Sequence, residues 1–210
     1  MVDAFLRHSP LAHLGLAGRA TTDQIKADDI GVAMGERPFR GIVNLRGPAE
    51  DEAFGAAAQT ALGVALPVAP NTTASDGQVT VLWLAPDEWW VVTPGDGPAM
   101  ADKLRRALEG VRSAVTDVSE SRTCIEVRGP RARDLLVKGC PLDLHPRVFG
   151  KGECAQSHLA KTMITLHMTT GDDHEDGPAF DLYVLNRFAD YLWLWLEDAA
   201  REYGLKVTGE

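Results

Sequence analysis

The sequence is short of cysteine, of basic residues and of long apolar runs. Three cysteines among 210 residues are too few for a disulfide framework, so we expect reduced thiols. Acidic residues outnumber basic ones, 30 to 21, and a formal net charge of -9 argues against a surface for nucleic-acid phosphates. The most apolar stretch, residues 191–196, is far shorter than the roughly 20 residues that cross a bilayer. We expect neither a nucleic-acid partner nor a membrane span.

Motifs for cofactor binding and for export are also missing. No Gly-x-Gly-x-x-Gly opens a helix after a strand, and no Gly-rich loop ends in Lys-Ser or Lys-Thr, so neither a dinucleotide cradle nor a phosphate loop is expected. Residues 1–16 have no basic start followed by a continuous apolar run. We expect a soluble, cytoplasmic protein.

Apolar periodicity predicts both strands and helices. β-branched and aromatic runs, several of them alternating with polar residues, predict strands at residues 39–45, 79–84, 89–93, 114–118, 124–128, 162–168 and 180–185. Helices are predicted where Gly or Pro brackets apolar residues at three-to-four spacing: after Pro48 and over residues 98–108, 130–139 and 187–203. The predicted buried stripe of the last helix is Phe188, Leu192, Trp195 and Ala199.

An internal echo divides the chain into two halves. Residues 43–48 and residues 125–130 each end a strand with Arg-Gly-Pro before a helix, and Arg46 and Arg128 are 82 positions apart. Each half then reads strand, helix, strands, helix, which indicates an α+β fold of internally duplicated, ferredoxin-like split βαβ units. We predict a single domain over residues 1–210 with pseudo-repeat halves of roughly 20–110 and 111–210. Chance recurrence of a favoured turn sequence is the alternative.

Several motifs resemble those of known families. Residues 116–132 resemble the glycine-cleavage T-protein family, in which a similar Asp-x-Ser turn precedes a strand, a Gly-Pro turn and a helix. A closer resemblance, to the gamma-subunit family of heterotetrameric sarcosine oxidase, covers nearly the whole chain. It is carried by residues 9–11, 83–89, 129–146, 154–157 and 191–193. It implies a single domain resembling the N-terminal region of T-protein.

The resemblance also implies a function. It implies a non-catalytic gamma subunit that assembles with alpha, beta and delta subunits into a flavin-dependent oxidoreductase acting on the CH-NH bond. Such a complex oxidatively demethylates sarcosine to glycine, passes the one-carbon unit to tetrahydrofolate and forms hydrogen peroxide. FAD, FMN, NAD and zinc are then implied to lie in other subunits. For this chain we expect no catalytic, cofactor-binding or metal-ligating residue.

The alternative is a free-standing folate-binding or one-carbon-transfer protein of the same superfamily. In T-protein relatives an acidic residue on a strand holds the folate ring, and the matching stretch here, residues 160–165, has no acid. A pterin edge left buried and unpaired would cost about 1 to 3 kcal/mol per group. We therefore favour the subunit over the folate binder.

Three other groups of residues could carry chemistry. Cys140, His145, Cys154 and His158 are zinc-type ligands, or else two buried thiols and two surface imidazoles. Lys-Gly-Cys at 138–140 resembles the signature of folate-binding relatives that assist iron-sulfur enzymes. Acidic residues 172–176 could bind a cation, but a solvated loop is favoured because calcium-loop spacing is missing.

Two predictions concern surfaces. Trp89 and Trp90 lie beside a turn, and we predict that they contact a partner subunit, with burial in the chain's own core as the alternative. Arg131, Arg133 and Lys138 are interpreted as the solvated face of a helix.

Overall fold

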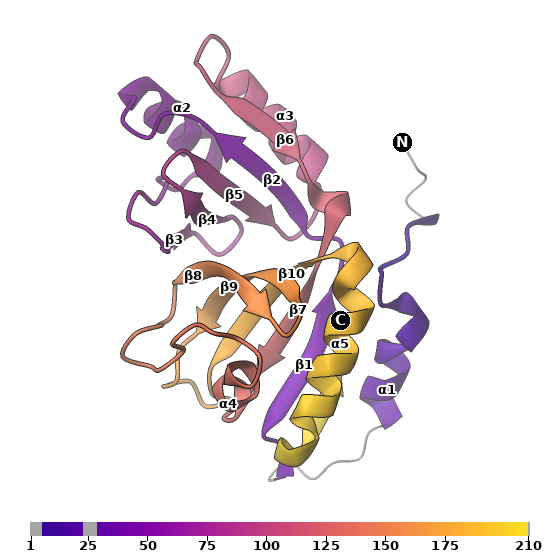
Figure 1. Cartoon of the computed structure of the whole chain (residues 1–210). Helices are drawn as coiled ribbons and strands as arrows, with labels where there is room; N and C mark the ends of the chain where they lie inside the picture. Colours follow the sequence, from indigo (N-terminus) through magenta and orange to yellow (C-terminus); the bar gives the residue numbers. More distant parts are fainter. Residues whose placement is uncertain (1–5, 23–28, 210) are drawn as a thin grey trace. The chain divides into compact units, whose positions relative to one another are not determined.

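The structure is a computed structural model that describes residues 6–22 and 29–209. Its contacts divide the chain into two compact units, each with its own sheet (Figure 1). Unit 1 consists of the described parts of Met1–Pro38 and Ser157–Glu210 together with Arg122–Lys151. Unit 2 consists of Phe39–Ser121 and Gly152–Gln156. The boundaries of these units differ from those of the predicted repeat halves, residues 20–110 and 111–210. The division into repeat halves stays a prediction.

Unit 2 is a split βαβ arrangement. Its elements are β2 (Gly41–Arg46), α2 (Glu52–Leu62), β3 (Thr73–Ser75), β4 (Thr80–Ala85), β5 (Glu88–Thr93), α3 (Gly97–Ala107), β6 (Ala114–Asp117) and the 3-10 turn η4 (Ser119–Ser121). The sheet order is β3-β4-β5-β2-β6, and β5 pairs antiparallel with both β2 and β4. Because α2 connects β2 to β4 and α3 connects β5 to β6, the order β2-α2-β4-β5-α3-β6 is a ferredoxin-like βαββαβ unit.

Two aromatic residues occupy the core of unit 2. The rings of Phe54 on α2 and Trp89 on β5 have centroids 5.8 Å apart, and both side chains are fully buried. The indole Nε1 of Trp89 donates to the Pro67 carbonyl oxygen at 2.7 Å. Trp90 is only 5% exposed. The prediction that Trp89 and Trp90 contact a partner subunit is therefore wrong, because both side chains pack inside this chain.

Unit 1 repeats the arrangement with one strand supplied from elsewhere in the sequence. Its elements are η2 (Ala12–Leu14), α1 (Leu16–Thr22), β1 (Val32–Arg37), β7 (Arg122–Arg128), α4 (Ala132–Val137), the second half of β8 (Cys154–Leu159), β9 (Thr162–Thr170), β10 (Ala179–Leu185), α5 (Asn186–Ala200), η5 (Arg201–Tyr203) and β11 (Leu205–Thr208). The sheet order is β11-β1-β7-β10-β9-β8.

The two halves of the sequence echo coincide with equivalent places in the two units. Strand β2 leads through Arg-Gly-Pro to α2, and β7 leads through Arg-Gly-Pro to α4. In the sheets β2 lies beside β5 and β7 lies beside β10, and β5 and β10 are the equivalent third strands of the βαββαβ order. In unit 1 the place of the fourth strand is taken by β1, which pairs antiparallel with β7, and β11 adds parallel to β1. The predicted α+β fold with duplicated split βαβ units is confirmed.

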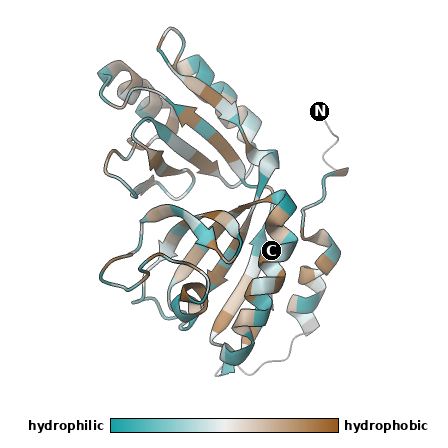
Figure 2. Cartoon of the chain, viewed as in Figure 1, coloured by the Kyte–Doolittle hydropathy of each residue, from teal (hydrophilic) through white to brown (hydrophobic). Residues whose placement is uncertain are grey.

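All seven predicted strands are present, but the predicted buried stripe of the last helix is right only at Leu192 and wrong at Phe188, Trp195 and Ala199. The buried residues of α5 are Ala189, Leu192, Trp193, Leu196 and Ala200. Phe188 and Trp195 lie on the flank, where Trp195 approaches Gly139 after α4. Figure 2 shows hydrophobic and hydrophilic bands alternating along α5. Because α5 carries apolar residues on two adjoining faces, the sequence pattern did not indicate which of them packs on β7 and β10.

Among the described residues no helix is long and apolar enough to cross a membrane.

Candidate functional site

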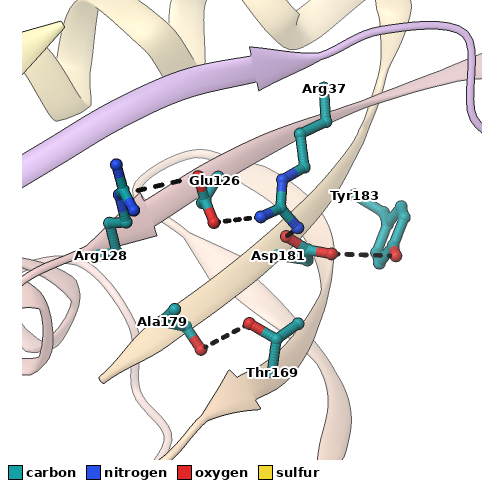
Figure 3. A network of polar contacts seen from close by, with 7 residues as sticks. All are labelled: Arg37, Glu126, Arg128, Thr169, Ala179, Asp181 and Tyr183. Atoms are coloured by element: carbon teal, nitrogen blue, oxygen red, sulfur yellow. Dashed lines mark hydrogen bonds and ion pairs between the residues drawn. The ribbon is translucent and has the colours of Figure 1, made fainter. Parts of the chain in front are cut away.

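A row of charged side chains crosses the sheet of unit 1 (Figure 3). Strand pairing places Glu126 of β7 opposite Asp181 of β10, and Asp181 opposite His167 of β9. Because side chains at directly paired positions of a sheet share a face, these three groups point to the same side. Arg37 of β1 reaches into the row from its edge.

Arg37 holds two carboxylates together. Its Nη1 donates to Asp181 Oδ1 at 3.0 Å, and its Nη2 forms an ion pair with Glu126 Oε1. Burial lowers the pKa of the guanidinium, but the facing Asp181 and Glu126 carboxylates outweigh it, so the pKa of Arg37 is raised overall. Tyr183 adds its hydroxyl, 3.5 Å from Asp181 Oδ2, and Arg128 Nε lies 4.0 Å from Glu126 Oε2.

His167 ends this row as a neutral imidazole. Burial, together with the charge of Arg37, lowers the pKa of His167 to about 4. Its Nδ1 is buried without a hydrogen-bond partner. An imidazole in this state is uncharged at neutral pH and faces the ion cluster without pairing with it. The row is a structural ion cluster that ties β1, β7 and β10 together, since both carboxylates are already engaged by Arg37.

Arg37, Glu126 and Asp181 were not predicted to form a group. A signal was present, because Asp181 interrupts the otherwise apolar strand β10 and Glu126 stands between Ile125 and Val127 of β7. Their contact with Arg37 depends on β1, which was not predicted as a strand.

The four zinc-type ligands do not form a metal site. Cys154 Sγ lies 3.3 Å from the Trp83 carbonyl oxygen, and burial raises the pKa of this thiol to about 12. Cys140 is also buried, whereas the His145 and His158 side chains are exposed. Within residues 6–22 and 29–209 no three His, Cys, Asp or Glu side chains come together in a way that could hold a metal ion. The interpretation as buried thiols and surface imidazoles fits these positions.

The acidic loop is anchored by an arginine. Arg133 donates from Nε and Nη2 to the two carboxylate oxygens of Asp172, at 2.7 and 2.6 Å, and these bonds lower the pKa of Asp172. The same guanidinium donates to the Leu144 carbonyl oxygen and lies over the Phe180 ring, 5.4 Å from its centroid. The Arg133 side chain is only 12% exposed. Its interpretation as part of a solvated helix face is wrong, because it joins two loops of unit 1.

In the Lys-Gly-Cys segment, Lys138 and Gly139 contact other parts of unit 1. Lys138 Nζ lies 4.3 Å from the centroid of the Tyr203 ring and pairs with Glu202. A Cβ added to Gly139 would lie 2.6 Å from the Trp195 side chain, so only glycine fits there. The segment thus packs against the last helix and the η5 turn. Residues 160–165 form the β8–β9 turn and the start of β9.

The Asp-x-Ser motif forms a tight turn in unit 2. The Ser119 backbone N–H donates to Asp117 Oδ1 at 3.1 Å, and Ser119 Oγ accepts from the Ile42 backbone N–H at 2.9 Å. A Cβ added to Gly97 would lie 2.0 Å from Ser119 Oγ. The turn therefore fixes the start of α3 against β2.

Comparison with known proteins assigns the chain to a family. The model of the "Sarcosine oxidase, gamma subunit family" matches residues 46–202. The chain is 34% identical over 205 residues to sarcosine oxidase subunit gamma of Corynebacterium sp. (strain U-96), covering 97% of this chain and 95% of that protein. The chain belongs to the sarcosine oxidase gamma subunit family. This confirms the family inferred from its motifs.

Solved structures agree with this family. A chain of the heterotetrameric sarcosine oxidase from Corynebacterium sp. U-96, in complex with pyrrole 2-carboxylate, superposes with a TM-score of 0.81 at 32% identity. The match covers 94% of this chain and 96% of that one. The aminomethyltransferase T of the Bartonella henselae glycine cleavage system superposes with a TM-score of 0.60 at 12% identity, covering 90% of this chain and 50% of that one. That likeness shows a shared fold, as the T-protein resemblance implied.

Proposed function

We propose that this chain is the non-catalytic gamma subunit of a heterotetrameric sarcosine oxidase, which oxidatively demethylates sarcosine to glycine. The observation that carries the proposal is similarity over nearly the full length of both chains, in sequence and in structure, to a subunit of that enzyme. Because the match extends across both units, the whole chain corresponds to the relative.

The proposed partners are the alpha, beta and delta subunits, and the proposed location is the cytoplasm. The flavins FAD and FMN, NAD and zinc lie in those subunits, and tetrahydrofolate receives the one-carbon unit there. The proposal that cofactors lie in other subunits is supported by the side chains of this chain that could have served as ligands, because they make contacts within the chain. Cys154 contacts two backbone carbonyls, and Lys138 and Asp172 form ion pairs within unit 1. Three buried thiols fit a reducing compartment.

The alternative, a free-standing folate-binding protein, is favoured by one observation, the fold shared with an aminomethyltransferase. Isothermal titration of the isolated chain with tetrahydrofolate separates the two functions. The subunit proposal expects no saturable heat. Binding that saturates at one molecule per chain would favour the folate-binding function.

The experiment that tests the subunit proposal is omission. The catalytic subunits are co-expressed with and without this chain, and sarcosine-dependent hydrogen peroxide formation is measured in the purified material. We expect omission to abolish assembly or activity. An assembled complex of unchanged activity without this chain would overturn the proposal.

A further inference from the structure

A small hollow lies in unit 1 between the N-terminal segment and the β1–β11 edge of the sheet. Its volume is about 240 Å³, less than the roughly 300 to 1,000 Å³ of pockets that take drug-sized ligands, so it suits a group of a few heavy atoms. Most of its walls carry small or apolar side chains. The lining residues are Ser9, Leu11, Ala12, Gly15, Leu16, Ala17, Gly18, Glu36, Pro38, Thr208 and Gly209.

One carboxylate is built into this hollow. Glu36 of β1 is only 8% exposed, and its two oxygens accept hydrogen bonds from the hydroxyls of Ser9 and Thr123, each at 2.6 Å. Distances of 2.5 to about 2.7 Å are those of O–H donors to an ionised carboxylate. A carboxylate offers about four lone-pair sites, so two remain for a further donor.

Glu36 has no ion-pair partner among the described residues. Over residues 6–22 and 29–209, no Lys, Arg or His side chain forms an ion pair with Glu36. None of the lining residues is cationic. Buried carboxylates are almost always paired, because taking an isolated charge out of water is expensive. The site therefore has room and a carboxylate acceptor that forms no ion pair with the described residues.

We propose that this hollow binds an alkylammonium group, with the ammonium donating to the Glu36 carboxylate and the alkyl stem lying along the Leu11 and Leu16 side. Two sources carry this chemistry. One is a free alkylamine, and the other is a lysine side chain of a partner subunit. The second source rests on the proposed function.

Two substitutions remove the site in different ways. Glu36→Gln keeps the shape of the side chain and removes its charge. Gly18→Leu adds a large side chain at a lining position of the hollow on α1, where an added Cβ meets nothing within 4 Å. Gly55→Leu is the matched control, since Gly55 is also a helical glycine whose added Cβ meets nothing within 4 Å, but it lies on α2 of unit 2. Circular dichroism and thermal unfolding establish that each variant is folded.

The first arm is a titration of the full chain with n-butylammonium chloride, with sodium chloride and n-butanol as controls for ionic strength and for the uncharged stem. We expect saturable binding of n-butylammonium only. Glu36→Gln and Gly18→Leu should each weaken it by about tenfold or more, whereas Gly55→Leu leaves it unchanged.

The second arm measures assembly with the catalytic subunits. If a partner lysine fills the hollow, Glu36→Gln and Gly18→Leu weaken assembly by about tenfold and n-butylammonium competes with it. If a free amine is the source, assembly is unchanged while the titration still saturates. Absence of saturable n-butylammonium binding, together with assembly of both variants equal to Gly55→Leu, overturns the proposal. If the wild-type chain does not assemble with the catalytic subunits, the proposed function is contradicted. The n-butylammonium titration still tests the hollow in that case.

Discussion

Arg37 on β1 and Asp181 on β10 meet across the intervening strand β7, with Arg37 Nη1 3.0 Å from Asp181 Oδ1. Between them Glu126 of β7 pairs with the same guanidinium. Arg37 thus pairs with both carboxylates, of Asp181 and Glu126, whose side chains are 9% and 14% exposed, and Arg128 adds a longer contact to Glu126. This contact joins a strand near the N-terminus to one near the C-terminus, and it holds β1 in the place of the fourth strand of unit 1.

Replacing Arg37 should destabilise the protein strongly. Arg37→Met takes the guanidinium away from two largely buried carboxylates and leaves Glu126 with only its longer contact to Arg128 Nε, 4.0 Å away. Removal of one partner of a buried ion pair costs about 3 to 5 kcal/mol. Urea unfolding followed by circular dichroism measures the change. The control is Arg105→Met, because Arg105 pairs with Asp102 on an exposed face of α3 and should change stability little. Equal effects of the two substitutions would contradict the structural role of the cluster.

His167 should make stability depend on pH below neutrality. The pKa of His167 is about 4 in the folded protein and 6.5 as a free side chain. Between these values the unfolded chain binds a proton that the folded chain does not, so stability falls as pH drops from about 6.5 to about 4. The loss from this group is on the order of 3 kcal/mol at most. His167→Gln should remove this part of the slope. Identical urea-unfolding profiles of both proteins across that range would show that His167 protonates readily when folded.

Arg133 should hold two loops of unit 1 in place. Lysine cannot reproduce its forked donation to Asp172 together with the bond to the Leu144 carbonyl, so Arg133→Lys should cost about 1 to 3 kcal/mol. Amide exchange should accelerate in residues 141–149 and 171–178. Arg131→Lys is the control, because Arg131 is half exposed and pairs within its own helix turn with Asp134. Unchanged exchange in both loops would refute this anchoring role.

Trp89 should affect folding and leave assembly alone. Trp89→Ala removes a fully buried indole and should cost about 3 to 5 kcal/mol. Trp89→Phe loses only the bond to the Pro67 carbonyl and part of the ring volume, so the folded variant should bind the catalytic subunits as the wild type does. A Trp89→Phe protein with near wild-type thermal stability and impaired assembly would mean that this side chain does reach a partner.

Much of the fold followed from local pattern, and the remainder depended on long-range pairing. Strands such as β5 and β10 carry β-branched and aromatic runs, and the Arg-Gly-Pro turns after β2 and β7 mark the duplicated unit. Strand β1 contains Gly35 and the charged pair Glu36 and Arg37, so nothing local marks it as a strand in the middle of a sheet. It is ordered there because β7 and β11 pair with its two edges.

For the candidate sites, too, local features could be predicted from the sequence, whereas features that depend on long-range strand pairing could not. That Cys140 and Cys154 are buried could be anticipated from the general behaviour of thiols. The Arg37 cluster and the Glu36 hollow could not be anticipated, because each joins residues far apart in sequence through β1. Only the strand order places Glu126 and Asp181 beside Arg37.

The most direct test of the central claim is the native mass of the complex that co-purifies with this chain from cells expressing the catalytic subunits. We predict a particle that contains this 22.7 kDa chain with the other subunits and forms peroxide from sarcosine, while the isolated chain forms none. Recovery of this chain as a separate species, with all activity in particles that lack it, would contradict the assignment as a gamma subunit.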